Sequence, residues 1–160
     1  MMKFPPLFLI AAALASPLAA LAADHHDHGA AAPQKMSLNA GKKWTTDAPL
    51  RQAMAAMRAS VGATLPLAHD GTATTAQFDA LSQEVNAQVA AIVQNCKLDA
   101  KADAQLHAVI ADLLSGVEVA EGKQQGKSRA AGVVQIAQGL NTYGKYFDHA
   151  QWEAIPIPKH

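Results

Sequence analysis

Two methionines, the only cysteine and one histidine form a set of donors that could bind a soft metal ion. Met54 and Met57 lie in one amphipathic segment, Cys96 ends the next, and His107 lies in the segment after that. Thioether, thiolate and imidazole ligands together suit Cu(I). The alternative is an ordinary core edge, because methionine often fills gaps in cores and a free cysteine behaves as a small hydrophobic residue. The spacing of these residues permits both interpretations.

A second set of donors follows a predicted signal peptide at residues 1–22. Lys3 gives the chain a positive start, residues 7–20 are almost entirely apolar, and Ala20-Leu21-Ala22 fits a small-residue cleavage site. This pattern is typical of secretory signals, and the apolar run is short for a membrane span. We therefore expect an exported protein, periplasmic if the source is Gram-negative, with no membrane span after signal removal.

Cleavage after Ala22 would place Ala23, Asp24 and His25 at the new N-terminus. This sequence resembles the amino-terminal copper- and nickel-binding motif, which has a free amine and a histidine in third place. The resemblance implies that the amine, two backbone amides and the imidazole form the planar nitrogen set that Cu(II) and Ni(II) favour. Cleavage one residue later again puts a histidine, His26, in third place. The alternative is a His-rich tail that binds metal only weakly, since such tracts commonly bind metals.

The composition argues against nucleic acid as a partner and favours helices. The chain has 13 Lys and Arg against 13 Asp and Glu, and losing Lys3 would leave the acidic residues in slight excess. This balance offers no basic field to nucleic acid or an anionic membrane. In an oxidising compartment, the lone Cys96 is buried, metal-bound or paired with another molecule. Few aromatic residues and abundant alanine favour helices over a β-sandwich.

Apolar residues recur at helical spacing in four segments, and each segment follows a residue that can cap a helix. The caps are Thr46 or Asp47 with Pro49 in the first turn, Thr74 with Gln77 as a capping box, Asp99, and Ser128. The predicted inward-facing residues are Leu50, Ala53, Met54, Met57, Val61 and Leu65; Phe78, Leu81, Val85, Val89, Ile92 and Cys96; Leu106, Ile110, Leu113, Leu114 and Val117; and Val133, Ile136, Ala137, Leu140, Tyr143 and Phe147. Pro66 and Asp70-Gly71 end the first segment or bend its last turn.

These segments predict an all-α protein, an antiparallel up-down four-helix bundle over residues 46–149. A flexible His-bearing tail and connector, residues 23–45, precede it, and an irregular tail, residues 150–160, follows it. In this topology, the first and third helices start at the pole where the second and fourth end. The four soft donors therefore approach one pole. Of the glycines in the last helix, Gly144 lies near the inner stripe, where it could admit a ligand or allow close helix packing, and we favour packing. Gly132 and Gly139 could simply soften the helix.

The topology and the export signal resemble those of cytochrome b562. This resemblance implies a haem b held between a methionine early in the first helix and a histidine late in the fourth. Met54 matches the methionine, and His149 is the candidate histidine. Helical projection puts His149 opposite Leu140, on the polar face, so His107 from another helix is the alternative ligand. Covalent haem is not expected, because the chain has no Cys-x-x-Cys-His motif.

Taken together, the donors predict an exported metal-binding protein that binds or transfers copper. We expect no catalysis, because no grouping of nucleophile, base and acid can be assembled from the spacing. Two alternatives stay open. One is a haem-binding electron-transfer bundle, and the other is a helical interaction protein without a metal, which pairs with a second copy or another exported protein.

Overall fold

A polar side chain caps the start of each helix in the computed structural model, which describes residues 35–158. The helices are α1 (Ala48–His69), α2 (Thr75–Asn95), α3 (Ala100–Ala120) and α4 (Arg129–Tyr146). The caps are Asp47, Thr74, Asp99 and Ser128, each of which accepts a backbone N–H of the first turn, and Thr74 forms a full capping box with Gln77. The predicted helix starts are therefore confirmed.

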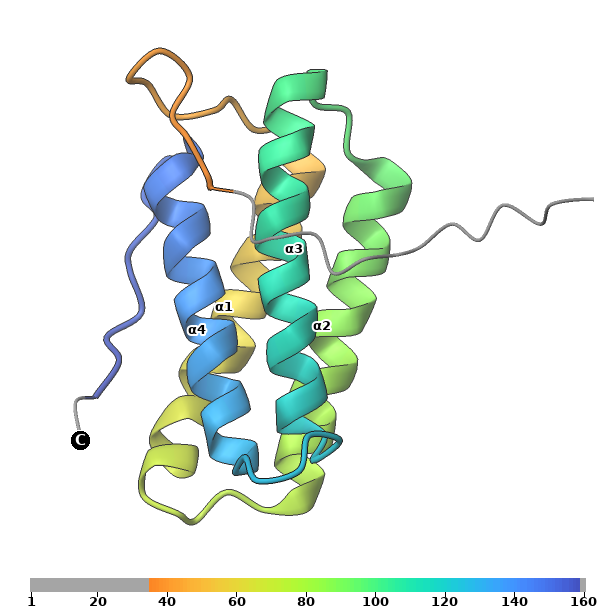
Figure 1. Cartoon of the computed structure of the whole chain (residues 1–160), viewed down its shortest axis with the longest axis vertical. Coiled ribbons are helices and arrows are strands. Elements are labelled where there is room, and N and C mark those ends of the chain that lie inside the picture. The colour runs from red at the N-terminus through yellow and green to blue at the C-terminus, as the bar shows by residue number, and fades with distance from the viewer. Residues whose placement is uncertain (1–34, 159–160) are drawn as a thin grey trace, which may run out of the picture. The chain divides into compact units, whose positions relative to one another are not determined.

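The four helices pack as an antiparallel ring, with no strand among the described residues (Figure 1). α1 lies against α2 and α4, and α3 lies against α2 and α4. This is the predicted all-α four-helix bundle. No helix within residues 35–158 has the length and hydropathy needed to span a membrane.

Two glycines let α3 and α4 approach closely. A Cβ added at Gly132 would lie 2.2 Å from the backbone nitrogen of Ala120 and 2.6 Å from the carbonyl oxygen of Gly116. A Cβ at Gly116 would in turn lie 2.8 Å from the Ile136 side chain. Gly132 is thus a site of close packing and does not merely soften the helix, because no other residue fits this crossing without moving the backbone.

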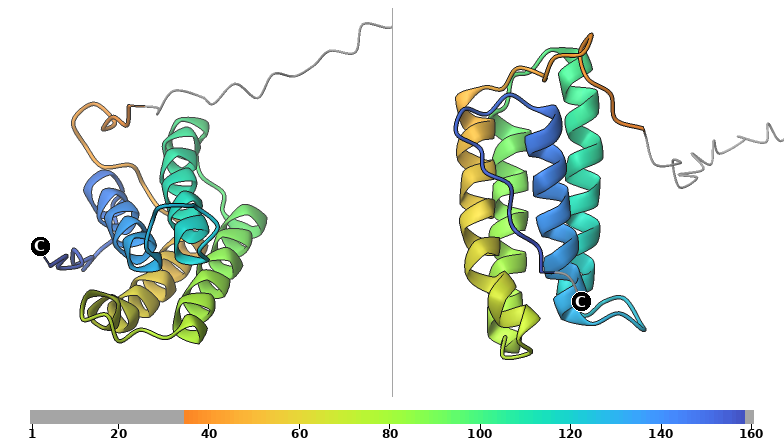
Figure 2. Two further views of the ribbon diagram at one scale, coloured as in Figure 1. Left: turned by 60° about the horizontal axis from the view of Figure 1, so that its bottom comes forward. Right: turned by 90° about the vertical axis from the view of Figure 1, so that its left-hand side faces the viewer.

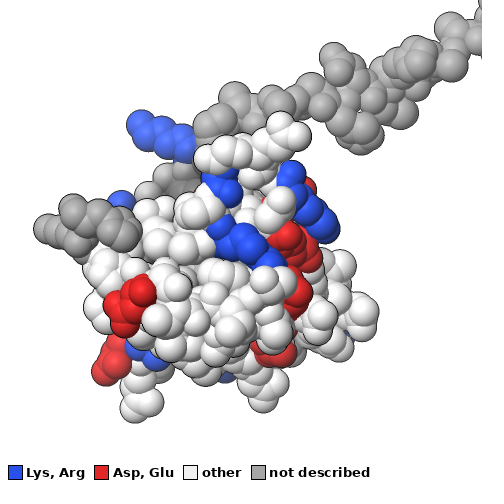
Figure 3. Space-filling view, turned by 90° about the horizontal axis from the view of Figure 1, so that it is seen from below, with Lys and Arg blue, Asp and Glu red and all other residues white. Residues whose placement is uncertain are grey.

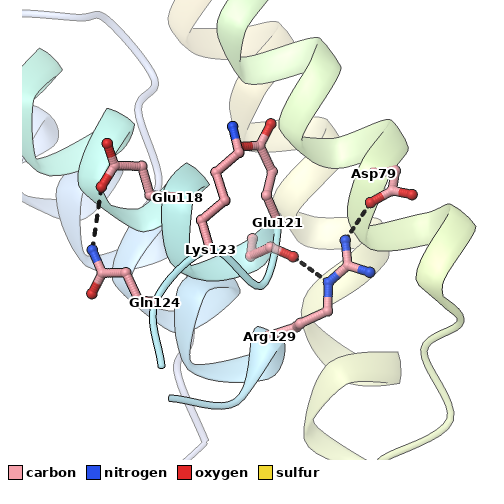
Figure 4. A network of polar contacts seen from close by, with 7 residues as sticks. Asp79, Glu118, Glu121, Lys123, Gln124 and Arg129 are labelled. Atoms are coloured by element: carbon pink, nitrogen blue, oxygen red, sulfur yellow. Dashed lines mark hydrogen bonds and ion pairs between the residues drawn. The ribbon is translucent and has the colours of Figure 1, made fainter. Parts of the chain in front are cut away.

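Charged side chains of both signs are interspersed over the pole where α1 and α3 end (Figure 3). Arg129 at the start of α4 binds the carboxylate of Asp79 on α2 and the carbonyl oxygen of Ala120 at the end of α3 (Figure 4). Its guanidinium also lies over the Phe78 ring, 5.0 Å from the ring centroid. One side chain therefore ties three helices together at this pole.

At the opposite pole, the connector before α1 pairs with the segment after α4. The Trp44 N–H donates to the Tyr146 carbonyl, and the Asp148 N–H donates to the Trp44 carbonyl, both at 2.8 Å. The indole of Trp44 is buried and donates to the Ser37 carbonyl at 2.7 Å. The segment after α4 then runs back over α1 and α4 without forming a helix (Figure 2). We call residues 149–158 the strap.

Candidate functional site

Met54 and Met57 lie inside the bundle, and both side chains are 0% exposed. They belong to the same hydrophobic cluster as Leu50, Tyr143 and Phe147. Their burial agrees with the prediction that they face inward. A metal ion could reach these thioethers only if other donors met it within the core.

His107 lies on the solvent side of α3. Its side chain is 71% exposed, and its Nδ1 lies 2.9 Å from the carbonyl oxygen and 3.4 Å from a carboxylate oxygen of Asp103, one turn earlier. The structure thus places His107 in solvent and Met54 in the core. The ring would have to leave Asp103 and turn inward to share a metal ion with Met54.

Cys96 is the C-cap of α2 and is half-buried beside Asp47, the N-cap of α1. The two side chains are hydrogen-bonded, and the Lys97 N–H donates to the same carboxylate at 2.7 Å. This contact confirms that the start of α1 and the end of α2 share a pole. Burial, together with the charge and hydrogen bond of Asp47, raises the pKa of the Cys96 thiol to about 12. At neutral pH the sulfur is therefore a thiol, and metal binding would have to displace its proton.

The carboxylate of Asp47 accepts hydrogen bonds from Leu50 in α1, from Cys96 at the end of α2 and from Lys97 after it. Burial raises its pKa, but hydrogen bonds from Lys97, Leu50 and Cys96 and the charge of Arg51 outweigh burial, so the net shift is downward. A carboxylate whose pKa is lowered by folding stabilises the fold above its ordinary pKa, and this contribution is lost as the pH falls through the lowered value. Asp47 therefore stabilises the bundle at neutral pH as a cap and as the link between α1 and α2.

The His, Cys, Asp and Glu side chains of the described residues do not form a metal site by themselves. Within residues 35–158, no three His, Cys, Asp or Glu side chains gather so that they could hold a metal ion. Ala23, Asp24, His25 and His26 lie outside the described residues. The Cu(I) site of Met54, Met57, Cys96 and His107 and the tail site both stay predictions.

The structure reveals a polar and aromatic cluster that the sequence did not suggest. Nδ1 of His149 lies 3.0 Å from the hydroxyl of the fully buried Tyr143. The Trp152 ring lies edge-on to Tyr143 and tilted against His149, with both centroid distances 4.9 Å. The projection of His149 onto the polar face of a helix was wrong, because α4 ends at Tyr146 and the chain then turns back. Nothing in the local sequence signals this return.

Burial shifts the pKa values of Tyr143 and His149 in opposite directions. It raises the pKa of the Tyr143 hydroxyl and lowers the pKa of His149, and the positive charge of Arg51 lowers the His149 pKa further. The hydroxyl therefore keeps its proton and can donate it to a neutral imidazole at Nδ1. This tautomer leaves the ring proton on Nε2. To bind haem through Nε2, His149 would have to move this proton to Nδ1, which could then no longer accept from Tyr143.

The lowered pKa of His149 predicts that acid weakens the fold. The folded protein holds this proton less tightly than the unfolded chain, so the stabilisation is complete above the ordinary pKa of 6.5 and is lost as the pH falls below it. We expect the free energy of unfolding, measured with urea, to fall between about pH 7.5 and 5.5. His149→Asn should reduce this fall. An equal fall in wild type and His149→Asn would contradict the prediction.

No family model, curated protein or solved structure matched this chain in the comparisons. The function therefore has to be argued from the residues themselves.

Proposed function

We propose that this protein is an exported copper-binding protein that holds Cu(II) at its processed N-terminus. The observation that carries the proposal is the sequence Ala23-Asp24-His25-His26, directly after a predicted cleavage site. Cleavage after Ala22 or after Ala23 puts a histidine in third place, so the proposal does not depend on a single cleavage point. The ligands would be the terminal amine, two backbone amides and the third-place imidazole, a set that favours square-planar Cu(II).

The bundle supports placing copper on the tail. His107 bonds to its own helix in solvent, Met54 is closed inside the core, and the Cys96 thiol holds its proton. An interior site would need all three to change, whereas the tail site needs a free amine and the loss of two amide protons as Cu(II) binds. The bundle would then carry the tail, and the role of the protein would be to bind or transfer the metal ion.

The proposal is tested by moving the histidine out of third place without removing it. Mature protein that starts at Ala23 should bind one equivalent of Cu(II) and show the visible d–d band of a square-planar nitrogen set. One glycine added ahead of Ala23 moves Asp24 into third place and should abolish this band. All histidines are kept in the extended protein, so any remaining signal measures non-specific binding.

His25→Ala and His28→Ala form the matched pair of variants. Both remove one imidazole from the same tail, but only His25 stands third in the mature chain. We expect the d–d band to disappear with His25→Ala and to persist with His28→Ala. Equal binding by the extended, His25→Ala and unmodified proteins would show that the third-place motif is not the copper site.

A further inference from the structure

The strap lies over α1 and α4, and we call the surface that it covers there, with Arg58, Asn141 and Gly144, the groove. The side chain of Asn141 binds both backbone groups of Ile155, donating to its carbonyl at 2.9 Å and accepting its N–H at 2.7 Å. Arg58 donates to the Glu153 carbonyl at 2.7 Å. Side chains of both helices therefore bind the main chain of the strap, and Arg58 also pairs with the Glu153 carboxylate at 3.5 Å. We call Asn141 on α4 and Arg58 on α1 the clamps.

The groove also holds two side chains of the strap. Gly144 provides the place for Trp152, because a Cβ at Gly144 would lie 2.2 Å from Cδ1 and Nε1 of the indole. The indole N–H has no hydrogen-bond partner among the described residues, so Trp152 is held through its ring. Ile155 is only 6% exposed. An aromatic and an aliphatic side chain held beside main-chain hydrogen bonds are features that peptide-binding surfaces use. We call these two side chains the anchors.

Closure of the strap onto its own bundle requires a strained turn. The Trp152 N–H donates to the His149 carbonyl at 3.0 Å, and Gln151 within this turn has a φ of +62°. A residue with a Cβ adopts this left-handed conformation at a cost. If the strap instead extended away from its own bundle, the turn would open and Gln151 could return to a negative φ. The bonds of Glu153 and Ile155 to Arg58 and Asn141 do not involve the turn, so a strap from another molecule could make them as well.

We propose that the groove between α1 and α4 is an interaction surface for a second copy of this chain, which inserts its strap in place of the resident one. The two copies would exchange straps through the turn at Gln151. The resident strap competes strongly, because its short connection gives it a high effective concentration. The exchanged form is therefore a minor species in the unmodified protein, and its detection requires that the resident strap be disabled.

Two complementary full-length variants make the exchange visible. The groove variant, Gly144→Ala with Asn141→Ala, keeps an intact strap but loses the place for Trp152 and the clamp for Ile155. The strap variant, Trp152→Ala with Ile155→Ala, keeps an intact groove but loses both anchors. Each variant alone should be monomeric by light scattering. An equimolar mixture should form a one-to-one heterodimer with twice the mass, because the intact strap fits the vacant groove.

A chain that carries all four substitutions is the matched control. Mixed with the groove variant, it offers no intact groove, so this mixture must stay monomeric. A monomeric mixture of the groove and strap variants, each folded by circular dichroism, would overturn the proposal.

A synthetic peptide of residues 150–160, titrated into the strap variant, separates the groove from the exchange. The peptide should bind with a change in its Trp152 fluorescence. Peptide binding without a heterodimer would show that the groove takes peptides but that two copies do not exchange straps, and the proposal would fall. A mixture that also dimerises with the control chain would overturn it as well, because the contact would then lie elsewhere.

Discussion

Gly132→Ala is expected to destabilise the bundle by about 3 kcal/mol, at the upper end for overpacked cores. The added Cβ would lie 2.2 Å from a backbone nitrogen and 2.7 Å from the Cα of Ala120. Backbone atoms of a neighbouring helix cannot rotate away as a side chain can, so α3 and α4 must separate. Urea unfolding followed by far-UV circular dichroism would measure the loss.

Gly62 is the matched control for this substitution. It also lies within a helix, α1, but nothing lies within 4 Å of the position of an added Cβ. Gly62→Ala should therefore stabilise the protein by roughly 0.5–1 kcal/mol, because alanine loses less backbone entropy in a helix. Similar effects at Gly62 and Gly132 would mean that the close approach of α3 and α4 does not limit stability.

Met54→Ala is expected to cost about 2–5 kcal/mol of stability, because it leaves a cavity under a side chain that is 0% exposed. Met54→Leu conserves volume and should cost less than about 1.5 kcal/mol. This pair separates the two interpretations of the buried methionine. If Met54 only packs, Met54→Leu should leave binding of Cu(I) and Cu(II) unchanged in metal titrations of the folded protein.

A loss of Cu(I) binding by the folded Met54→Leu variant would instead support an interior thioether site. Met57→Leu provides a comparison one turn deeper, at a side chain that is also 0% exposed. Neither substitution should alter the d–d band of Cu(II) at the N-terminus, because that ligand set contains no sulfur. The proposed tail site and the predicted interior site can therefore be tested independently of each other.

The helices and their starts were predictable because local interactions determine them. Asp47, Thr74, Asp99 and Ser128 each bind backbone groups within one turn, so the capping pattern can be recognised without knowledge of the fold. The inward-facing stripes follow from helical periodicity, and short connections favour antiparallel neighbours. The prediction for Leu114 was wrong, because α3 is rotated so that Leu114 is 37% exposed and Val109 is buried instead. Pro66 was the ambiguous signal, and α1 continues through it to His69, where Asp70 and Gly71 follow.

The arrangement of the candidate site was less predictable, because rotation about a helix axis decides it. A residue on the flank of a stripe can face the core or solvent, and His107 faces solvent while Met54 faces the core. The sequence spacing puts each residue about two turns after the start of its helix. It did not determine whether their side chains point toward each other.

The sequence by itself determined four amphipathic helices, their caps, and a histidine-bearing stretch beside a predicted cleavage site. Only the tertiary structure decided how the chain returns after α4, bringing His149 onto Tyr143, Trp152 over Gly144 and Ile155 against Asn141. The reason is the range of the interactions. Caps and stripes depend on neighbours within about a turn, whereas the strap is held by residues that come together only after α1 and α4 have packed.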